Sequence, residues 1–458
     1  MFEIILGLFL AVGIPLGLGY SVVIVLFQKR PLGILFSLAL AYGLGMGLLT
    51  QWMLILGALK IPLGVATIGL PLISLTIGLS IAITVLGKNI KPLTLSRSNV
   101  TEQKWDVLSI ILALYVLYCV VYIFWRSLSI PIADWDAIAT IAFKAKVFFD
   151  ERSLAHLKTL PYDSYPLHVS FLETWIAMNL SHWDDQLIKV IFPLTFLSYL
   201  SIQYYFLRIF VNRRWALLGN ILLVGSNFFM YHATIGYRDF TLMYYNCVTI
   251  ILLTLWNCQK EDAYLVMAGL FSGFTTFSKM EGMIYLLLHV IILIFILVKI
   301  NPYSFLNSLR KLCKFGIPSF GIYFIYFFYK FFTKAHLVKQ GTEISLSWDN
   351  LNRIPTIIYK FLENLFLTGN WNLIWVLFLL SIINPHKVKQ RAAITIPLFT
   401  LAIFGVSFFL FFLLTPYFEW ISVPGKEDAL LSRIILHCFP LSTILIILLN
   451  SPSQENHP

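Results

Sequence analysis

Long runs of apolar residues alternate with short polar segments along the whole chain of 458 residues. Each run approaches the ~20 residues that a helix needs to cross ~30 Å of hydrocarbon. The runs are too continuous for the strands of a membrane barrel, which alternate over ~10 residues. The pattern therefore predicts an all-α polytopic membrane protein with about thirteen transmembrane helices. The predicted spans are 3–27, 32–57, 62–87, 106–126, 186–211, 215–232, 239–257, 262–278, 281–299, 314–333, 365–384, 392–414 and 432–450.

Basic residues concentrate in alternate loops between these spans. Because loops rich in Lys and Arg stay on the cytoplasmic side, the N-terminus is expected outside and the C-terminus inside. The basic segments are Lys29–Arg30, Lys88 to Lys104, Arg208 to Arg214, Lys260, Lys299 to Lys314 and Lys387 to Arg391.

This topology requires that the apolar segment 167–180 does not cross the membrane. The segment is short and carries Glu173, so we expect an interfacial or re-entrant helix. Three longer loops, 127–185, 334–364 and 415–431, then lie outside. Because acidic residues and irregular backbone gather there, we expect any chemistry on the extracytoplasmic face.

Composition agrees with a membrane protein and narrows the possible partners. The chain is 59% hydrophobic and 12% charged, with a mean hydropathy of +0.82. Its net charge of +11 is explained by the short basic loops, so no nucleic-acid partner is expected. The five cysteines are scattered and form no CxxC pair, which indicates neither a disulfide framework nor a zinc site.

The stretch ADWDAIATIAFKAK, residues 133–146, places four charges directly after an apolar run. Asp134 suits the cap of a helix, and Asp136, Thr140 and Lys144 would share one face of it at a spacing of four residues. The simpler interpretation is a capped amphipathic helix on the outer leaflet, with Lys144 and Lys146 turned toward lipid phosphates. The functional interpretation is a general base at the membrane surface, with Lys144 available for an anionic substrate.

Four further polar clusters fall at the predicted outer surface. Each has a simpler structural interpretation, such as a local ion pair or a side chain that reaches the interface. Their shared location favours a single site with carboxylates for proton abstraction and cations for phosphate. The clusters contain His168 with Glu173, Arg238 with Asp239, Lys279 with Glu281, and Arg433 with His437.

The sequence resembles the GT-C superfamily of integral-membrane glycosyltransferases over roughly residues 105–450. DWDAIATIAFKAK is similar to the Asp-centred motif in the long first outer loop of that group. DSYPLHVSFLETW stands where a juxtamembrane helix begins, and GYRDF, SKMEG and LLSRIILHCFP look like downstream segments of bacterial mannosyltransferase-like members. The resemblance implies a polyprenyl-phosphate-sugar donor used outside the cytoplasm, in the plasma (inner) membrane.

The expected activity is transfer of one sugar to a glycan, lipid or protein acceptor. Asp136 is the expected general base and Asp134 its substitute, while Asp239 would position the acceptor. Asp136 and Asp239 could also share a divalent metal ion, although nothing in their spacing requires one. Candidates for the lipid phosphate are Arg433 and Lys279, and the remaining substrate-binding candidates are Arg238, His437, Glu281, Lys144 and His168.

The chain is expected to divide into N-terminal helices (1–105), a GT-C-like catalytic module (106–300) and C-terminal helices that complete the donor site (301–458). Three alternatives stay open. A transporter or flippase for a lipid-linked or anionic solute would need ionisable residues near the bilayer midplane. A glycan ligase or polymerase would hold longer chains in the outer loops, and a scaffold subunit would have no activity of its own.

Overall fold

The computed structural model describes residues 2–28, 32–86, 105–300, 302, 304–333, 347–383, 391–422 and 427–452. Within these ranges every regular element is a helix. The helices that begin the chain are α1 (Phe2–Leu26), α2 (Ile34–Ala58), α3 (Val65–Leu86) and α4 (Val107–Ser129). The segment that follows α4, expected from the sequence to be the first outer loop, holds α5 (Trp135–Ala137), η1 (Ile138–Ala142), α6 (Phe143–Glu151), η2 (Leu157–Thr159) and α7 (His168–Leu180).

The rest of the chain returns to the bundle. Its first part comprises η3 (Leu187–Val190), α8 (Ile191–Phe210), α9 (Arg213–Val224), α10 (Asn227–His232), α11 (Arg238–Gln259), α12 (Asp262–Ser278), α13 (Gly282–Phe295) and η4 (Ile296–Ile300). Its second part comprises α14 (Phe305–Thr333), η5 (Trp348–Arg353), α15 (Ile354–Phe366), α16 (Ile374–Ile383), α17 (Arg391–Leu414), α18 (Phe418–Ser422), α19 (Glu427–Leu436) and α20 (Phe439–Asn450).

Among the described residues, nine helices are long and apolar enough to cross a membrane, or ten if α19 and α20, which meet at a bend of 48°, form one span. A polytopic membrane protein is therefore supported, but the expected count of thirteen is not confirmed. The segment 215–232 is interrupted between α9 and α10, and 365–384 contains a turn before the ten residues of α16. α12 is continuous but has only 17 residues.

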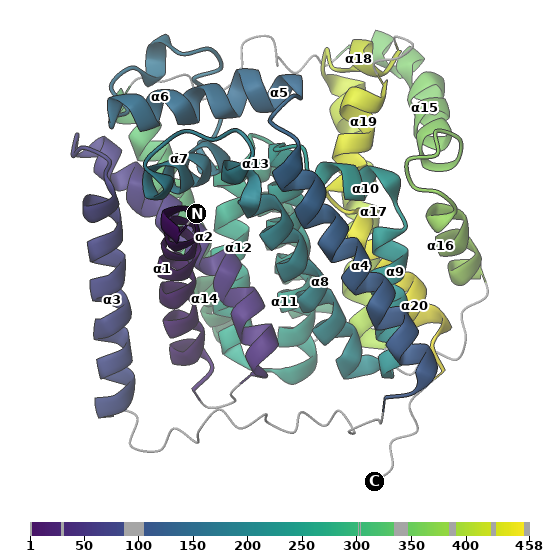
Figure 1. Cartoon of the computed structure of the whole chain (residues 1–458). Coiled ribbons are helices and arrows are strands. Elements are labelled where there is room, and N and C mark those ends of the chain that lie inside the picture. The colour runs from purple at the N-terminus through teal and green to yellow at the C-terminus, as the bar shows by residue number, and fades with distance from the viewer. Residues whose placement is uncertain are drawn as a thin grey trace.

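The helices form a bundle with α11 at its centre. The apolar part of α11 is 100% buried, whereas those of α3 and α4 are 17% buried and face outward. The short helices α5, α6 and α7 lie at one end of the bundle with α15 and α18, and the N-terminal end of α1 points to the same end (Figure 1). The C-terminal part of α20 lies toward the opposite end. The segments expected from the sequence to lie outside the membrane therefore gather at one end of the bundle.

Small residues let α1 and α2 pack closely. A Cβ atom on Gly45 would overlap the carbonyl oxygen of Pro15, and one on Gly19 would overlap that of Ala41. Glycine at such crossings lets two backbones approach, which is how helices associate inside a membrane. The α1–α2 pair in turn holds α7, because the Trp175 indole donates a 2.8 Å hydrogen bond to the carbonyl of Ala11.

The helix α7 is not a span, since it has only 13 residues. It was expected to be an interfacial or re-entrant helix, and twelve of its residues are buried inside the protein, so it packs against other helices of the chain. Ser170 and Thr174 donate hydrogen bonds to the carbonyls of Ile141 and Ala145. α7 therefore supports the outer-loop helices from below and fixes the backbone that carries Asp136.

Candidate active site

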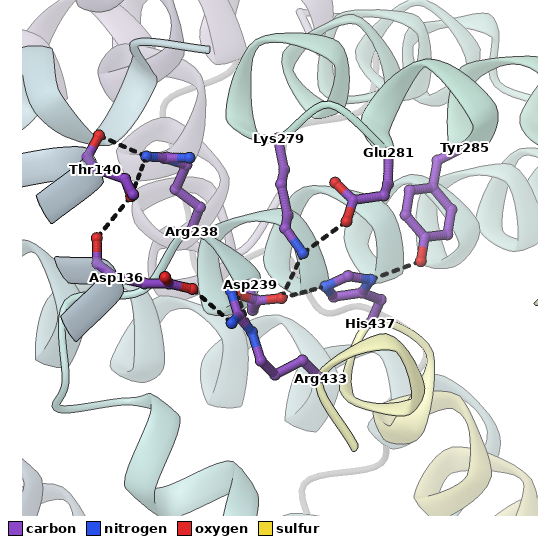
Figure 2. A network of polar contacts seen from close by, with 9 residues as sticks. All are labelled: Asp136, Thr140, Arg238, Asp239, Lys279, Glu281, Tyr285, Arg433 and His437. Carbon is purple, nitrogen blue, oxygen red and sulfur yellow. Dashed lines mark hydrogen bonds and ion pairs between the residues drawn. The ribbon is translucent and has the colours of Figure 1, made fainter. Parts of the chain in front are cut away.

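Asp239 is the centre of a buried polar network at the outer-loop end of the bundle (Figure 2). It lies in the first turn of α11, where a carboxylate also favours the helix dipole. One carboxylate oxygen accepts from Lys279 Nζ at 2.8 Å and lies 3.1 Å from His437 Nε2. The other accepts from Arg433 Nη2 at 2.7 Å and Nε at 3.0 Å. Asp239 is completely buried, so these cations supply the positive charge that its carboxylate needs.

Arg433 joins this buried carboxylate to Asp136. Its second terminal nitrogen, Nη1, donates to Asp136 Oδ2 at 2.6 Å, and its guanidinium lies 4.8 Å from the centre of the Tyr237 ring. The Asp136 side chain is 34% exposed, against 0% for Asp239. The guanidinium therefore divides the two carboxylates into a buried anchor and a group open to reactants.

The loop between α12 and α13 supplies Lys279 and Glu281. Lys279 Nζ lies 2.8 Å from Glu281 Oε1 as well as from Asp239. Burial alone would lower the pKa of Lys279, but these two carboxylates raise it above its usual value. Burial acts in the opposite direction on Glu281, and Lys279 lowers the pKa of that carboxyl. Both groups are therefore held in their charged forms.

His437 connects Asp239 to Tyr285 on α13. The distance from His437 Nδ1 to the Tyr285 hydroxyl is 2.7 Å. Because an ionised carboxylate only accepts hydrogen bonds, His437 donates one to Asp239 through Nε2. When the imidazole is neutral, its Nδ1 accepts a hydrogen bond from the Tyr285 hydroxyl. Tyr285 and Tyr237 are two members of the site that sequence reasoning did not single out.

A π-helical turn connects Asp136 with Arg238. Arg238 Nη2 donates to the carbonyl and the hydroxyl oxygen of Thr140, both at 2.6 Å, and the Thr140 hydroxyl donates to the Asp136 carbonyl at 2.6 Å. Such turns are rare and often occur at functional sites. Here the turn, residues 138–142, changes the register of the helix, so Asp136 and Lys144 do not share the face that regular spacing predicts.

Lys144 instead lies away from the network. Its side chain is completely buried, and Nζ donates to the backbone carbonyl of Tyr162. Asp134 occupies the N-cap position of α5 without capping it through its side chain; its carboxylate accepts from the Tyr231 hydroxyl. Lys146 is exposed, as expected.

His168 and Glu173 are both enclosed by α7 and its neighbours. His168 Nδ1 lies 2.8 Å from the Thr50 hydroxyl, and burial lowers the pKa of this histidine to about 3. Burial also raises the pKa of Glu173 well above its usual value. Both side chains are 0% exposed, so the prediction that His168 contacts substrate finds no support in its surroundings.

The structure thus brings together Asp136, Arg238, Asp239, Lys279, Glu281, Arg433 and His437. Within the described ranges, no group of three or more His, Cys, Asp and Glu side chains is arranged to hold a metal ion. The Arg433 guanidinium stands between Asp136 and Asp239, where a shared ion would have to bind. Metal dependence stays an untested prediction.

Comparisons with protein-family models, with curated proteins and with solved structures found no match for this chain.

Proposed function

We propose that this protein transfers a sugar from a polyprenyl phosphate to a hydroxyl-bearing acceptor on the extracytoplasmic side of the membrane. The observation that supports the proposal is the position of Asp136. With 34% of its side chain exposed, against 28% for Glu281 and 0% for Asp239, it is the most exposed of the three carboxylates of the network, and Arg433 fixes its orientation. A general base must be both accessible and held in place.

In the proposed reaction Asp136 accepts the proton of the acceptor hydroxyl. The acceptor oxygen forms a bond with the anomeric carbon, and the bond from that carbon to the donor phosphate oxygen breaks. The phosphate leaves with the bonding electron pair, so nearby cations stabilise its developing charge. Arg433, with 18% of its side chain exposed, is close enough to Asp136 to serve both groups.

The decisive experiment compares Asp136→Asn with Asp134→Asn in the purified full-length protein. Transfer of radiolabelled sugar is measured from a panel of polyprenyl-phosphate sugars. We expect Asp136→Asn to lose roughly 10²–10⁴-fold in turnover, while Asp134→Asn, whose side chain contacts Tyr231 outside the network, keeps most of its activity. Equal thermal stability shows that folding is intact. Near-normal turnover of Asp136→Asn would rule out this base.

A buried polar chain favours transport as the second candidate function. From His437 it passes through the Asn246 amide, 2.6 Å from the His437 carbonyl, to His289 at 2.9 Å and Ser272 at 2.9 Å. Polar side chains inside a membrane are costly and are often functional. Asn246 lies seven residues beyond Asp239 on α11, about 10 Å along the helix. Proton or solute flux in liposomes, abolished by His289→Leu, would favour transport.

A further inference from the structure

Two buried basic side chains, Lys144 and Arg238, flank the ring of Tyr165. Lys144 Nζ lies 5.7 Å and Arg238 Cζ 4.7 Å from the ring centre. Lys144 is 0% and Arg238 5% exposed. Neither forms an ion pair within the described residues, and Arg238 Nε has no hydrogen-bond partner. By contrast, Arg433 and Lys279 each form an ion pair with Asp239.

Backbone carbonyl oxygens of one turn accept hydrogen bonds from Lys144 and from Lys330. The turn spans Tyr162–Tyr165 and is closed by a 2.9 Å hydrogen bond from the Tyr165 amide to the Tyr162 carbonyl, which also accepts from Lys144. On its other side Lys330 Nζ donates to the Ser164 carbonyl at 2.6 Å. Tyr162 adopts a left-handed φ of 57°, a backbone conformation that is unfavourable for a residue other than glycine. The turn is therefore held by lysines in a strained conformation.

Buried positive charge without a counter-ion is unfavourable. Burial, together with the positive charges of Arg238 and Lys330, lowers the pKa of Lys144 to about 6 against an opposing effect of Asp163. An anion in place of the turn carbonyls would restore the charge balance. A phosphate group suits the position, since it offers several acceptor oxygens to a lysine and a guanidinium.

An apolar cavity lies beside the part of α14 that carries Lys330. Its volume is about 440 Å³, and its lining includes Leu54, Ile55, Phe328 and Tyr329, with Lys60 as the one charged residue. Tyr329 directly precedes Lys330, which contacts the turn. An apolar chain attached to an anionic head group would place the chain in this cavity and the head group near the cations.

We propose that Lys144 and Arg238 bind the phosphate of an amphiphilic phosphate monoester, whose apolar chain occupies the cavity between α2 and α14. The Tyr162–Tyr165 turn gives way when the ester binds, and its carbonyls are replaced by phosphate oxygens. The site lies next to Thr140 and Asp136 through Arg238. That the ester is the lipid donor or the released lipid product rests on the proposed function; the binding itself does not.

The test is a binding measurement on the purified full-length protein in a neutral detergent. Decyl phosphate, inorganic phosphate and decanol are titrated separately by calorimetry. We expect decyl phosphate to bind tightest, because only it supplies both the charge and the chain. Equal affinity for inorganic phosphate would overturn the role of the cavity, and equal affinity for decanol would overturn the role of the cations.

Lys144→Met is the main variant, since an apolar side chain of similar length should be tolerated at a buried position. Loss of a charge-assisted hydrogen bond, ~1.5–3 kcal/mol, should weaken decyl phosphate binding by roughly 10- to 100-fold. Lys146→Met, two residues away and exposed, is the matched control and should bind as the wild type does. Unchanged binding in Lys144→Met would overturn the proposal.

Ile55→Trp provides a second, independent readout, because it fills the cavity without changing charge. It should remove the advantage of decyl phosphate over inorganic phosphate; an advantage that persists would contradict the proposed position of the chain. None of these measurements requires sugar transfer. If the protein binds decyl phosphate through Lys144 but transfers no sugar, the phosphate site stands and the proposed function falls. If it transfers sugar but binds decyl phosphate without Lys144, the proposed function stands and the phosphate site falls.

Discussion

Replacement of Asp239 by asparagine should destabilise the protein because Arg433 and Lys279 would each keep only one carboxylate partner, Asp136 or Glu281. Asparagine has nearly the same shape, so the change removes charge and little volume. Arg433 and Lys279 would stay at an enclosed position, each having lost a carboxylate contact of 2.7–2.8 Å. Breaking a buried ion pair costs about 3–5 kcal/mol. We expect Asp239→Asn to fall in that range.

The corresponding thermal shift can be worked out from the size of the chain. Unfolding entropies of ~2.1 cal/mol/K per residue give about 1 kcal/mol/K for 458 residues. The loss should therefore lower the melting temperature by roughly 3–5 °C. Intrinsic tryptophan fluorescence of the detergent-solubilised protein during heating measures this shift.

Asp262→Asn is the matched control. Asp262 also binds two lysines, Lys311 and Lys314, but it is 27% exposed. Exposed pairs contribute about 0–1 kcal/mol, so the control should shift the melting temperature by no more than about 1 °C. Equal shifts in Asp239→Asn and the control would refute the assignment of Asp239 as the anchor.

The double variant Asp239→Asn with Arg433→Gln tests the physical reason directly. If the cost arises from unpaired positive charge, removal of the Arg433 charge should recover part of the lost stability. If the double variant loses the sum of both single effects, uncompensated charge is not the cause.

Three further changes probe the fold, its titration and its orientation. Gly45→Ala should destabilise the α1–α2 crossing, because its Cβ would overlap the backbone of α1, whereas Gly78→Ala on α3 has open space and should be neutral or stabilising; equal melting temperatures would contradict the close packing. His168, with its pKa lowered to about 3, is protonated in the unfolded chain near pH 6.5 but not in the folded one, so stability falls as the pH drops from 6.5 toward 3. Between pH 7.5 and pH 5 the free energy of unfolding of the wild type should fall by about 2 kcal/mol more than that of His168→Asn. Parallel stability–pH curves of the two proteins would contradict this. A cysteine at Trp348 should react with a membrane-impermeant maleimide in intact cells, and one at Ser304 only after permeabilisation; the reverse pattern would invert the topology.

The membrane spans were predictable where hydropathy and helix length agree. The predicted span 239–257 corresponds to α11, and 3–27 corresponds to α1. The single span predicted over 215–232 is instead two helices, α9 and α10. Hydropathy averaged over an apolar window does not detect the helix cap between them. Ser226 accepts a 3.2 Å hydrogen bond from the amide of Phe229 and so starts a new helix inside the apolar run.

The members of the site were largely predictable, but their partners were not. Charged residues at the ends of apolar helices are few in such a chain, so Asp136, Asp239 and Arg433 stood out. Arg433 lies 297 and 194 positions from its two carboxylate partners, and no local pattern encodes contacts at that separation. Regular helical spacing also placed Lys144 beside Asp136, because a π-helical turn leaves no clear signal in the sequence.

The division of the site into two halves follows from two consecutive residues at the start of α11. Neighbouring positions on a helix point about 100° apart, so Arg238 and Asp239 face different surroundings. Asp239 engages Arg433, Lys279 and His437, while Arg238 contacts Thr140 and the Tyr165 ring.

The turn at 136–140 contacts both halves, through the Asp136 carboxylate and the Thr140 hydroxyl. α11 is the most deeply buried span, so the two halves cannot move independently without disturbing the core. An anion bound beside Arg238 would therefore act on the backbone of Asp136 through the Thr140 hydroxyl, which accepts from Arg238 and donates to the Asp136 backbone carbonyl, both at 2.6 Å. Through this short connection, binding of a charged head group would shift the backbone that carries the Asp136 carboxylate.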